Sequence, residues 1–528
     1  MTLSYETLPG DIDHMIADDH AIVERQFQHL EAGRGNRRVL ATQIAFELAL
    51  HAFAEEQVLY PLWPEVGMTA ENADARQEHQ RMKELLVTLQ GGEPGEPGFE
   101  QALTALIAEV RHHVRDEEGQ ELPEFRGKVG AERMGQLGKE FLAAKRKAPT
   151  RAHPNAPDGG LKEKVAGALA KPLDKARDAA SGQAKELATD ASGLLNPQAQ
   201  AIVDALSSLG PQPFEILEPL QARKQPGPDA TVKELLRQQG RPTDPEPVGS
   251  VEDRKVPDGA GGEQTLRVYT PEGVAAGAPV IMWIHGGGWV LFDIDTYDAS
   301  CRGLCNKTGA IVVSPDYRRA PEAVFPASHE DVLAAYRWTV QHAAEPGGDA
   351  TRMGIGGESV GGNMAPATVL ALLQAGEALP VAQVCAYPVT SGEQFGESMA
   401  DAADARPLNR ALLSWMAMHA FEGVPDAAKD PRIDLLGLPA ETLAAMPPTL
   451  VITDERDVLR SQGEQFAANL EKAGAQVTGV RYDGVMHGFF GASAVLDAAE
   501  QAQQQAADHF LRAFASATPP TTDREVNR

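Results

Sequence analysis

The first 127 residues carry a pattern of apolar and polar positions that predicts four helices. Asn36 is a plausible N-cap for the second helix, Tyr60 and Pro61 stop that helix, and Gly119 is expected to end the fourth. Helices of this length joined by short loops predict an antiparallel bundle. The expected helices cover residues 12–32, 36–59, 69–89 and 99–118.

The C-terminal part follows a different pattern, in which short apolar runs alternate with segments of helical length. Residues 280–284 and 449–453 are continuous apolar runs, which are typical of strands buried on both faces of a sheet. Residues 477–482 alternate between apolar and polar, which favours an edge strand. The alternation from about 265 to 515 therefore predicts a mostly parallel sheet covered by helices on both faces.

The segment between these regions, residues 128–195, follows neither pattern. It is basic as far as Arg151 and then rich in Ala, Lys, Glu and Asp, with Pro172 interrupting it. Large apolar residues are sparse, which favours a solvated linker over contact with an anionic membrane surface. We therefore expect a bundle over 1–127, a linker over 128–195, a second domain over 196–516 and a disordered tail over 517–528.

Composition and charge narrow the possible partners and the compartment. The formal net charge of −27 over 528 residues argues against nucleic acid, whose phosphates would be repelled. No apolar run approaches the length of a membrane span, and no signal peptide is visible at the N-terminus. Three cysteines are too few for a disulfide framework. These features together predict a cytoplasmic protein.

Ser359 lies in a Gly-x-Ser-x-Gly motif, between Gly357 and Gly361. An apolar segment ending at Ile355 precedes it and an apolar run of helical length follows it. A strand, a sharp turn and a helix are the setting in which this motif forms a nucleophile elbow, whereas the motif alone would indicate only a Gly-rich turn. Glycines beside the serine let strand and helix approach each other closely. The pattern indicates Ser359 as a catalytic nucleophile.

A second glycine motif follows the apolar run at 280–284: His285 and then three glycines. The negative oxygen of a tetrahedral acyl intermediate needs backbone N–H donors at close range, and consecutive glycines permit that approach. We expect the N–H groups of Gly286, Gly287 and Val360 to form the oxyanion hole.

A base and its orienting acid are expected downstream. A serine hydroxyl needs an imidazole to take its proton, and the imidazole needs a carboxylate to hold its tautomer. His487 follows the predicted edge strand, and both Asp454 and Asp457 follow the strand at 449–453. The order serine, aspartate, histidine is that of α/β-hydrolases. The pattern itself does not separate Asp454 from Asp457.

From about residue 196 to 514 the chain resembles the hormone-sensitive lipase-like esterases. The likeness rests on the two glycine motifs, on Asp316-Tyr-Arg-Arg-Ala-Pro-Glu322 and on Phe325-Pro-Ala327, while Glu358 and Val360 replace the more usual Asp and Ala beside the serine. The resemblance implies an α/β-hydrolase fold with a helical cap, built from an amphipathic helix at residues 201–206 and from residues around 409–422. It also implies Asp457 as the triad acid and hydrolysis of small or medium-chain carboxylic esters without a cofactor.

The N-terminal bundle carries a repeated His-x-x-x-Glu pattern, His51 with Glu55 and His113 with Glu117. A spacing of four places imidazole and carboxylate on one helical face. His20 and His79 each follow an acidic residue on the other two helices. Mixed imidazole and carboxylate ligands suit iron, with zinc or manganese as alternatives, and two carboxylates can bridge a pair of cations. The predicted metal ligands are His20, His51, Glu55, His79, His113 and Glu117.

This region resembles the hemerythrin HHE cation-binding family, which implies a di-iron site or another divalent metal, with O2 or another small molecule as a candidate ligand. Oxygen-carrying members have a second histidine on helix three, one turn from the first, where this chain has Ala75 and Lys83. The predicted function is therefore a cytoplasmic serine esterase fused to a metal-binding bundle. The alternative is an iron-, oxygen- or redox-responsive sensor with hydrolysis as its output.

Overall fold

The computed structural model of the chain describes residues 3, 7–149, 183–394 and 396–517. The chain divides into two compact units, one formed by residues 1–225 with 397–418 and the other by residues 226–396 with 419–528. Each unit has its own core, and they are taken in turn. The predicted tail from residue 517 lies outside the described residues except for Ala517.

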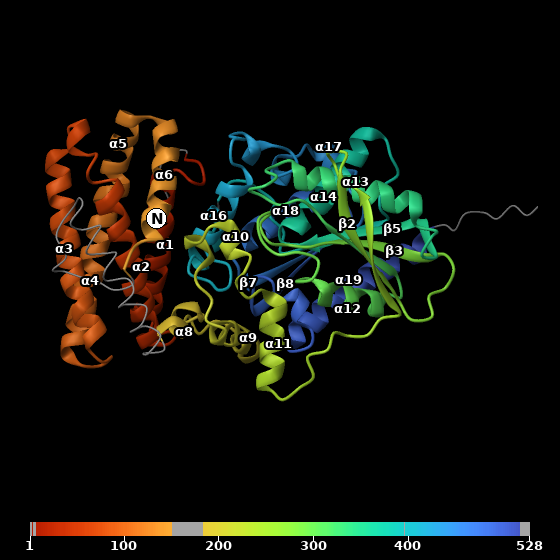
Figure 1. Ribbon diagram of the computed structural model, residues 1–528, viewed down its shortest axis with the longest axis horizontal. Coiled ribbons are helices and arrows are strands. Elements are labelled where there is room, and N and C mark those ends of the chain that lie inside the picture. The colour runs from red at the N-terminus through yellow and green to blue at the C-terminus, as the bar shows by residue number, and fades with distance from the viewer. Residues whose placement is uncertain (1–2, 4–6, 150–182, 395, 518–528) are drawn as a thin grey trace, which may run out of the picture. The chain divides into compact units, whose positions relative to one another are not determined.

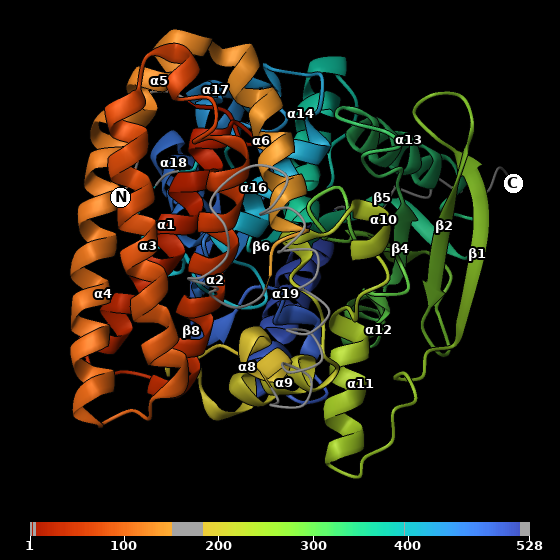
Figure 2. The same cartoon turned by 60° about the vertical axis from the view of Figure 1, so that its left-hand side comes forward.

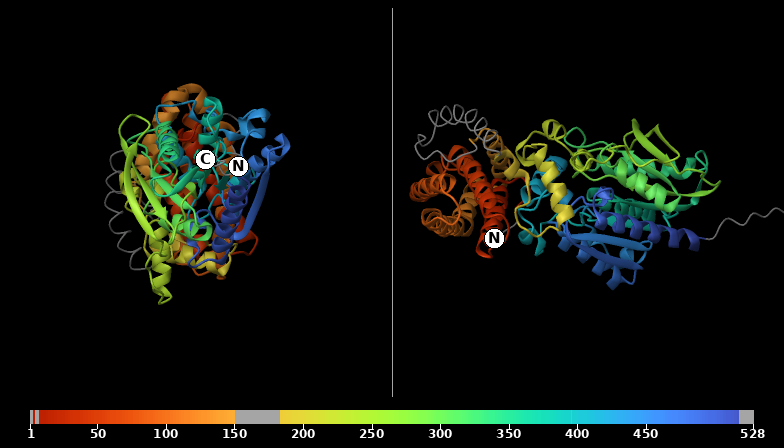
Figure 3. Two further views of the ribbon diagram at one scale, coloured as in Figure 1. Left: turned by 90° about the vertical axis from the view of Figure 1, so that its right-hand side faces the viewer. Right: turned by 90° about the horizontal axis from the view of Figure 1, so that it is seen from below.

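The first unit is built on four long helices, whose bounds agree with the expected ones to within a few residues. Asn36 caps α2, where its side chain accepts hydrogen bonds from the N–H groups of Arg38 and Val39. Figure 2 shows these helices running alongside one another, and the right-hand view of Figure 3 looks along several of them. The helices are α1 (Ile12–Glu31), α2 (Arg37–Val58), α3 (Thr69–Gly91) and α4 (Pro97–Asp116).

The sequence predicted that the fourth helix ends at Gly119, but the helical path continues beyond this residue. A π-helical turn, η2 (Glu117–Glu121), carries α4 into α5 (Leu122–Val129), and α6 (Ala131–Lys145) follows after Gly130, whose φ is 83°. The π turn lets two consecutive glutamates, Glu117 and Glu118, both be buried. Gly119 lies inside this π turn. The tendency of a glycine to break a helix is modest, and the tertiary context can override it.

The predicted boundary at residue 127 therefore falls within α5, and the predicted linker begins with a packed helix. Met134, Leu137 and Phe141 of α6 are buried in the same apolar cluster as Ile12 and Trp63. The sequence masked this role because the buried residues of α6 are interspersed with Lys, Arg and Glu. Residues 150–182, the Ala- and Lys-rich part of the predicted linker, lie outside the described residues.

Short helices complete the first unit. The Gln43 side chain of α2 donates to the carbonyl oxygens of Glu186 and Thr189, at 2.8 and 2.9 Å, and so holds the end of α8. Arg410 forms a buried ion pair with Asp18 of α1, with 2.6 Å between Nε and Oδ1. By such contacts, the segments that the sequence assigned to the cap, α9 and residues 409–418, belong to this unit. The elements are α8 (Gln183–Ala188), α9 (Pro197–Ser208), η3 (Phe214–Ile216), α10 (Pro219–Ala222), α15 (Ser398–Asp401) and most of α16 (Arg410–Ala420).

The second unit is built on an eight-stranded sheet with the order β1-β2-β4-β3-β5-β6-β7-β8. The pairs β1–β2 and β2–β4 are antiparallel, and all the other neighbours are parallel. The predicted edge position of 477–482 is confirmed, because these residues lie in the last strand. The strands are β1 (Ser250–Pro257), β2 (Glu263–Thr270), β3 (Ala278–Ile284), β4 (Ile311–Asp316), β5 (Gly348–Glu358), β6 (Ala382–Ala386), β7 (Thr449–Arg456) and β8 (Val477–Met486).

Helices cover both faces of this sheet, which explains why the central strands are continuous apolar runs. Figure 1 shows α12 and α19 on one face and α13, α14 and α18 on the other. These helices are α12 (Asp298–Thr308), α13 (Ala327–His342), α14 (Val360–Ala375), α18 (Arg460–Ala473) and α19 (Asp497–Ser516), with α11 (Pro228–Gln238) and α17 (Ala440–Ala444) beside them. The predicted fold class, a helical bundle followed by an α/β-hydrolase sheet, is confirmed.

In the described part of the chain, none of the helices has the length and apolarity needed to cross a membrane. Cys301, Cys305 and Cys385 are buried and are free thiols.

Candidate functional sites

Ser359 stands at a strained turn between β5 and α14. Its φ of 58° and ψ of −117° are unusual for a residue with a side chain, and they point to a backbone held by its surroundings. The flanking glycines are required by space: a Cβ at Gly357 would lie 2.6 Å from the Gly361 carbonyl carbon, and one at Gly361 would lie 2.1 Å from the Ile284 oxygen. Such a turn places the serine at the N-terminus of α14, where developing negative charge is favoured.

His487 and Asp457 lie immediately beyond β8 and β7, at the same edge of the sheet as Ser359, because all three strands are parallel. His487 Nδ1 lies 2.9 Å from Asp457 Oδ2, so this contact leaves Nε2 as the other ring nitrogen. The other Asp457 oxygen accepts a hydrogen bond from the Leu459 N–H at 2.9 Å. Of the two aspartates that the sequence left open, the structure thus pairs Asp457 with the histidine.

The glycine loop after β3 lies beside the elbow. A Cβ on Gly286 would stand 3.2 Å from the Ser359 Cβ, and Gly287 has a φ of 109°, which a larger residue would adopt only with strain. Among the described residues, no backbone carbonyl accepts the N–H of Gly286 or Gly287. Val360 is the first residue of α14, so its N–H has no partner within the helix. The N–H groups of Gly287 and Val360 are therefore open to an oxyanion, whereas the Gly286 N–H is directed at the Tyr297 hydroxyl oxygen.

The tyrosine of the Asp-Tyr-Arg-Arg motif holds this loop in place. The Tyr317 hydroxyl donates to the carbonyl oxygens of His285 and Gly286, at 3.0 and 3.2 Å, and its ring stacks on the His285 ring with centroids 4.1 Å apart. Burial lowers the pKa of His285 to about 3, so this imidazole is neutral at physiological pH. His285 is thus part of the scaffold of the loop and carries no charge into the site.

Two further residues near the triad were missed by sequence reasoning. Glu358, the residue before the serine, accepts hydrogen bonds from Trp283 Nε1 at 3.0 Å and from the Tyr387 hydroxyl at 2.5 Å. The Tyr387 ring also lies 4.7 Å, centroid to centroid, from the His487 ring. Tyr387 follows β6, which lies between β5, the strand before Ser359, and β8, the strand before His487. It therefore contacts both Glu358, next to the serine, and the His487 ring. The one signal in the sequence was the acidic Glu358 inside the Gly-x-Ser-x-Gly motif.

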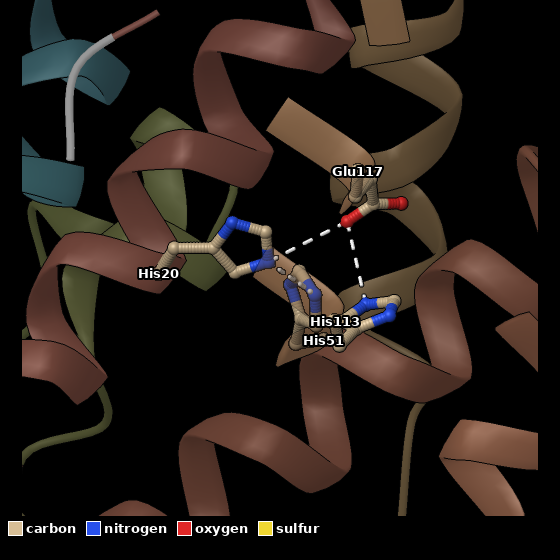
Figure 4. A group of neighbouring side chains, drawn as sticks. All are labelled: His20, His51, His113 and Glu117. Carbon is tan, nitrogen blue, oxygen red and sulfur yellow. Dashed lines mark hydrogen bonds and ion pairs between the residues drawn. The ribbon is translucent and has the colours of Figure 1, made fainter. Parts of the chain in front are cut away.

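In the first unit, the six predicted metal ligands come together in the core of the bundle. They form two overlapping groups, His20, His51, His113 and Glu117 in one and Glu55, His79 and His113 in the other. His20 Nε2 lies 3.2 Å from His51 Nε2 and 3.5 Å from Glu117 Oε2, and Figure 4 shows the first group converging. Each of the four long helices, or the turn directly after it, supplies at least one of these side chains.

The Nδ1 atom of every inner histidine is held by a carboxylate that the sequence analysis did not assign. The distances are 2.9 Å for His20 to Glu118, 3.2 Å for His51 to Asp19, 3.0 Å for His79 to Glu56 and 2.9 Å for His113 to Glu78. Such contacts fix the tautomer and aim Nε2 inward. Each of these carboxylates is the chain neighbour of an inner ligand, and that adjacency was the available signal.

The cluster has the polarity that a cation requires. Both oxygens of Glu117, Oε1 of Glu55 and Nε2 of His113 are buried and have no hydrogen-bond partner in the described part of the chain. Burial alone lowers the pKa of His51, but the carboxylates of Glu55 and Asp19 outweigh it and raise that pKa to about 10. The protein therefore places negative charge where bound cations would neutralise it, and a mixed imidazole and carboxylate set suits iron, zinc or manganese.

The structure also shows what replaces a second histidine on helix three. Lys83 Nζ lies 2.7 Å from Glu56 Oε2, so it binds one of the orienting carboxylates, and Ala75 packs in the apolar core. The donor set of an oxygen carrier with five histidines is not reproduced at these positions.

Comparison with known proteins gives a family for each of two regions of the chain. The model of the alpha/beta hydrolase fold matches residues 281–491, and that of the hemerythrin HHE cation binding domain matches residues 11–125. Esterase LipI of Mycobacterium tuberculosis is 35% identical over 255 residues, which span 46% of this chain and 77% of that protein. Ethyl acetate hydrolase of Pseudomonas putida is 34% identical over 242 residues, 45% of this chain and 74% of that protein.

A solved structure agrees with these relatives. The thermostable esterase from Pseudomonas putida ECU1011 is 31% identical, with a TM-score of 0.55, over 62% of this chain and 98% of that one. These relatives favour ester hydrolysis over the sensor hypothesis as the main function. The HHE domain implies cation binding, in agreement with the cluster in the bundle. The chain therefore belongs to the hormone-sensitive lipase-like esterases of the α/β-hydrolase fold, and it carries an N-terminal hemerythrin HHE cation-binding domain.

Proposed function

We propose that the protein is a serine carboxylesterase that works through an acyl-enzyme, with Ser359 as nucleophile, His487 as base and acid, and Asp457 as orienting acid. The observation that carries this proposal is the strained Ser359 turn, at the same sheet edge as a histidine whose Nδ1 lies 2.9 Å from Asp457. A carboxylate at Nδ1 holds the tautomer in which Nε2 can accept a proton.

In the first step, Ser359 Oγ attacks the ester carbonyl carbon while His487 Nε2 takes the hydroxyl proton. The N–H groups of Gly286, Gly287 and Val360 stabilise the negative oxygen of the tetrahedral intermediate. The bond to the alcohol oxygen then breaks, and His487 returns its proton to the departing alcohol. A water molecule repeats the sequence on the acyl-enzyme, which releases the carboxylic acid and restores the free serine.

The substrate class follows from the relatives. Proteins named as carboxylesterase and ethyl acetate hydrolase are among them, so we propose esters with small or medium-length acyl chains. The hydrolytic residues need no cofactor for this chemistry.

For the bundle we propose a pair of iron ions or other divalent cations. His20, His51, His113 and Glu117 would hold one cation, while Glu55 and His79, with His113 between the two groups, would hold the other. When bound, an iron pair supplies redox chemistry and binding of O2 or another small molecule. The four orienting carboxylates keep the imidazole Nε2 atoms aimed inward and accept the Nδ1 protons.

The esterase proposal is tested by hydrolysis of p-nitrophenyl butyrate with the full-length Ser359→Ala variant. Removal of the nucleophile should lower kcat by at least about 10⁴-fold, because loss of the serine disables the whole triad. The matched control is Ser516→Ala, at the exposed end of α19, which should keep the wild-type rate. Turnover by Ser359→Ala within tenfold of wild type would show that another residue is the nucleophile.

A further inference from the structure

Asp454 is a buried carboxyl group beside the triad that the proposed mechanism does not use. It lies on β7, three residues before Asp457, and its side chain is fully buried. An oxygen of Asp454, an oxygen of Asp457 and a ring nitrogen of His487 all lie within 4.8 Å of one another. Among the described residues, none donates a hydrogen bond to either Asp454 oxygen.

The charges around Asp454 decide its protonation. Asp457 faces it on the same strand end, His487 faces it from the end of β8, Tyr387 from the end of β6 and Arg460 from α18. The Arg460 guanidinium donates to the Glu455 carbonyl, at 2.9 Å from Nη1, and is only a weak counter-charge for Asp454. Burial and the neighbouring Asp457 hold the pKa of Asp454 well above its usual range. Two adjacent buried carboxylates cannot both be ionised without a large cost.

The geometry of Asp457 leaves room for a donor. One of its oxygens accepts from the His487 ring and the other from the Leu459 N–H, and each carboxylate oxygen has a second lone pair. A neutral Asp454 has one O–H to donate, and Asp457 is the acceptor beside it. A proton on Asp454, donated to Asp457, would give the Asp454 side chain a hydrogen bond that it otherwise lacks among the described residues.

We propose that Asp454 is a positioning residue, whose neutral acid form donates its O–H to the Asp457 carboxylate and thereby weakens the hold of Asp457 on the His487 proton. The inference rests on the proposed function, since it concerns the same triad. A carboxylate that already accepts a strong hydrogen bond is less basic. It therefore stabilises the imidazolium less than a carboxylate without such a donor would.

The experiment is the pH dependence of kcat/KM for p-nitrophenyl butyrate, measured on the full-length protein. Asp454→Ala removes the donor, so the acidic limb of the kcat/KM profile should move to higher pH by about 0.5 to 1 unit. This shift corresponds to a fraction of the free energy of a hydrogen bond to a charged group. Asp454→Asn keeps a neutral N–H donor of the same size and should leave the limb in its wild-type place. Asp483→Asn, an exposed change of equal charge on β8, is the control for general electrostatics.

Each outcome decides the matter. A downward shift in Asp454→Asn would show that the native group is ionised, and an unmoved limb in Asp454→Ala would show that it donates nothing to Asp457; either result overturns the proposal. Infrared difference spectra provide a measurement that does not depend on turnover: the wild type should show the C=O stretch of a protonated carboxylic acid at pH 8, and Asp454→Asn should lack it. If Ser359→Ala keeps its activity while this band is present, the proposed nucleophile fails but the neutral Asp454 stands.

Discussion

At the scale of single residues, both sites orient an imidazole with a carboxylate. His487 is held through Nδ1 by Asp457, and His113 is held through Nδ1 by Glu78, each at 2.9 Å. In both cases the carboxylate occupies Nδ1 and leaves Nε2 for the role that we propose, proton transfer with Ser359 or binding of a cation. The proposed chemistry differs because His487 lies at the same edge of the sheet as the Ser359 turn, whereas His113 lies among three further imidazoles and two carboxylates.

A residue-scale prediction follows for Glu78. Its side chain is half-buried and accepts from His113, a member of both ligand groups. Glu78→Gln keeps the size but loses the charge that makes the imidazole a strong ligand, so the affinity for Fe(II) should fall by about 10- to 100-fold. Competition with a chromophoric chelator measures it. Glu109→Gln, which alters an exposed pair with Arg81 on the same bundle, is the control. Equal affinities for the two variants would contradict the orienting role.

At the scale of elements, glycines set how closely segments approach. A Cβ on Gly138 of α6 would lie 1.8 Å from the Gly10 carbonyl oxygen, just before α1 begins. A glycine in mid-helix costs helix propensity relative to alanine, and here the cost is accepted because α6 packs against the start of α1. The same reasoning holds for Gly361, where α14 meets the end of β3.

Gly138→Ala should therefore destabilise the first unit by about 1 to 3 kcal/mol, because the overpacked contact outweighs the gain in helix propensity. Urea unfolding of the full chain, followed by circular dichroism, measures the change. Gly127→Ala is a matched control in α5, since a Cβ there meets nothing within 4 Å. The control should be neutral or should stabilise by up to about 1 kcal/mol. Equal effects of the two substitutions would show that α6 does not rest on Gly10.

At the scale of the whole molecule, the two sites are built within different units. Every predicted metal ligand lies in the unit of residues 1–225 with 397–418, and the predicted triad lies in the unit of residues 226–396 with 419–528. Each unit has its own buried core, so each site depends on the packing of its own unit.

Removal of the metal should consequently affect one unit. His51→Ala combined with His113→Ala should abolish metal binding and lower the unfolding temperature of the first unit, since cations that bind only the folded state stabilise it. The calorimetric transition of the second unit should remain. His112→Ala is the control, because this neighbour of His113 is 57% exposed. Unchanged metal content in the double variant would remove the di-metal proposal, and loss of both transitions would show that the units unfold together.

The amino-acid sequence by itself determined whatever depends on local spacing. A separation of four residues places His51 and Glu55 on one face of a helix, and glycines on both sides of Ser359 permit a turn that other residues would block. Apolar runs and their alternation predicted a sheet with helices on both faces, and the order of Ser359, an aspartate and His487 predicted their arrangement at its edge.

Only the tertiary structure decided matters that depend on segments distant in the chain. Asp454 lies near the end of β7 and Asp457 directly follows it, and the position of His487 at the end of another strand pairs it with Asp457. The helix α6 reads as a charged linker until its buried face meets α1 and α2, and the orienting role of Glu78 exists only because α3 lies against α4. Spacing along the chain constrains neighbours within a turn or two, whereas these contacts depend on how whole elements pack.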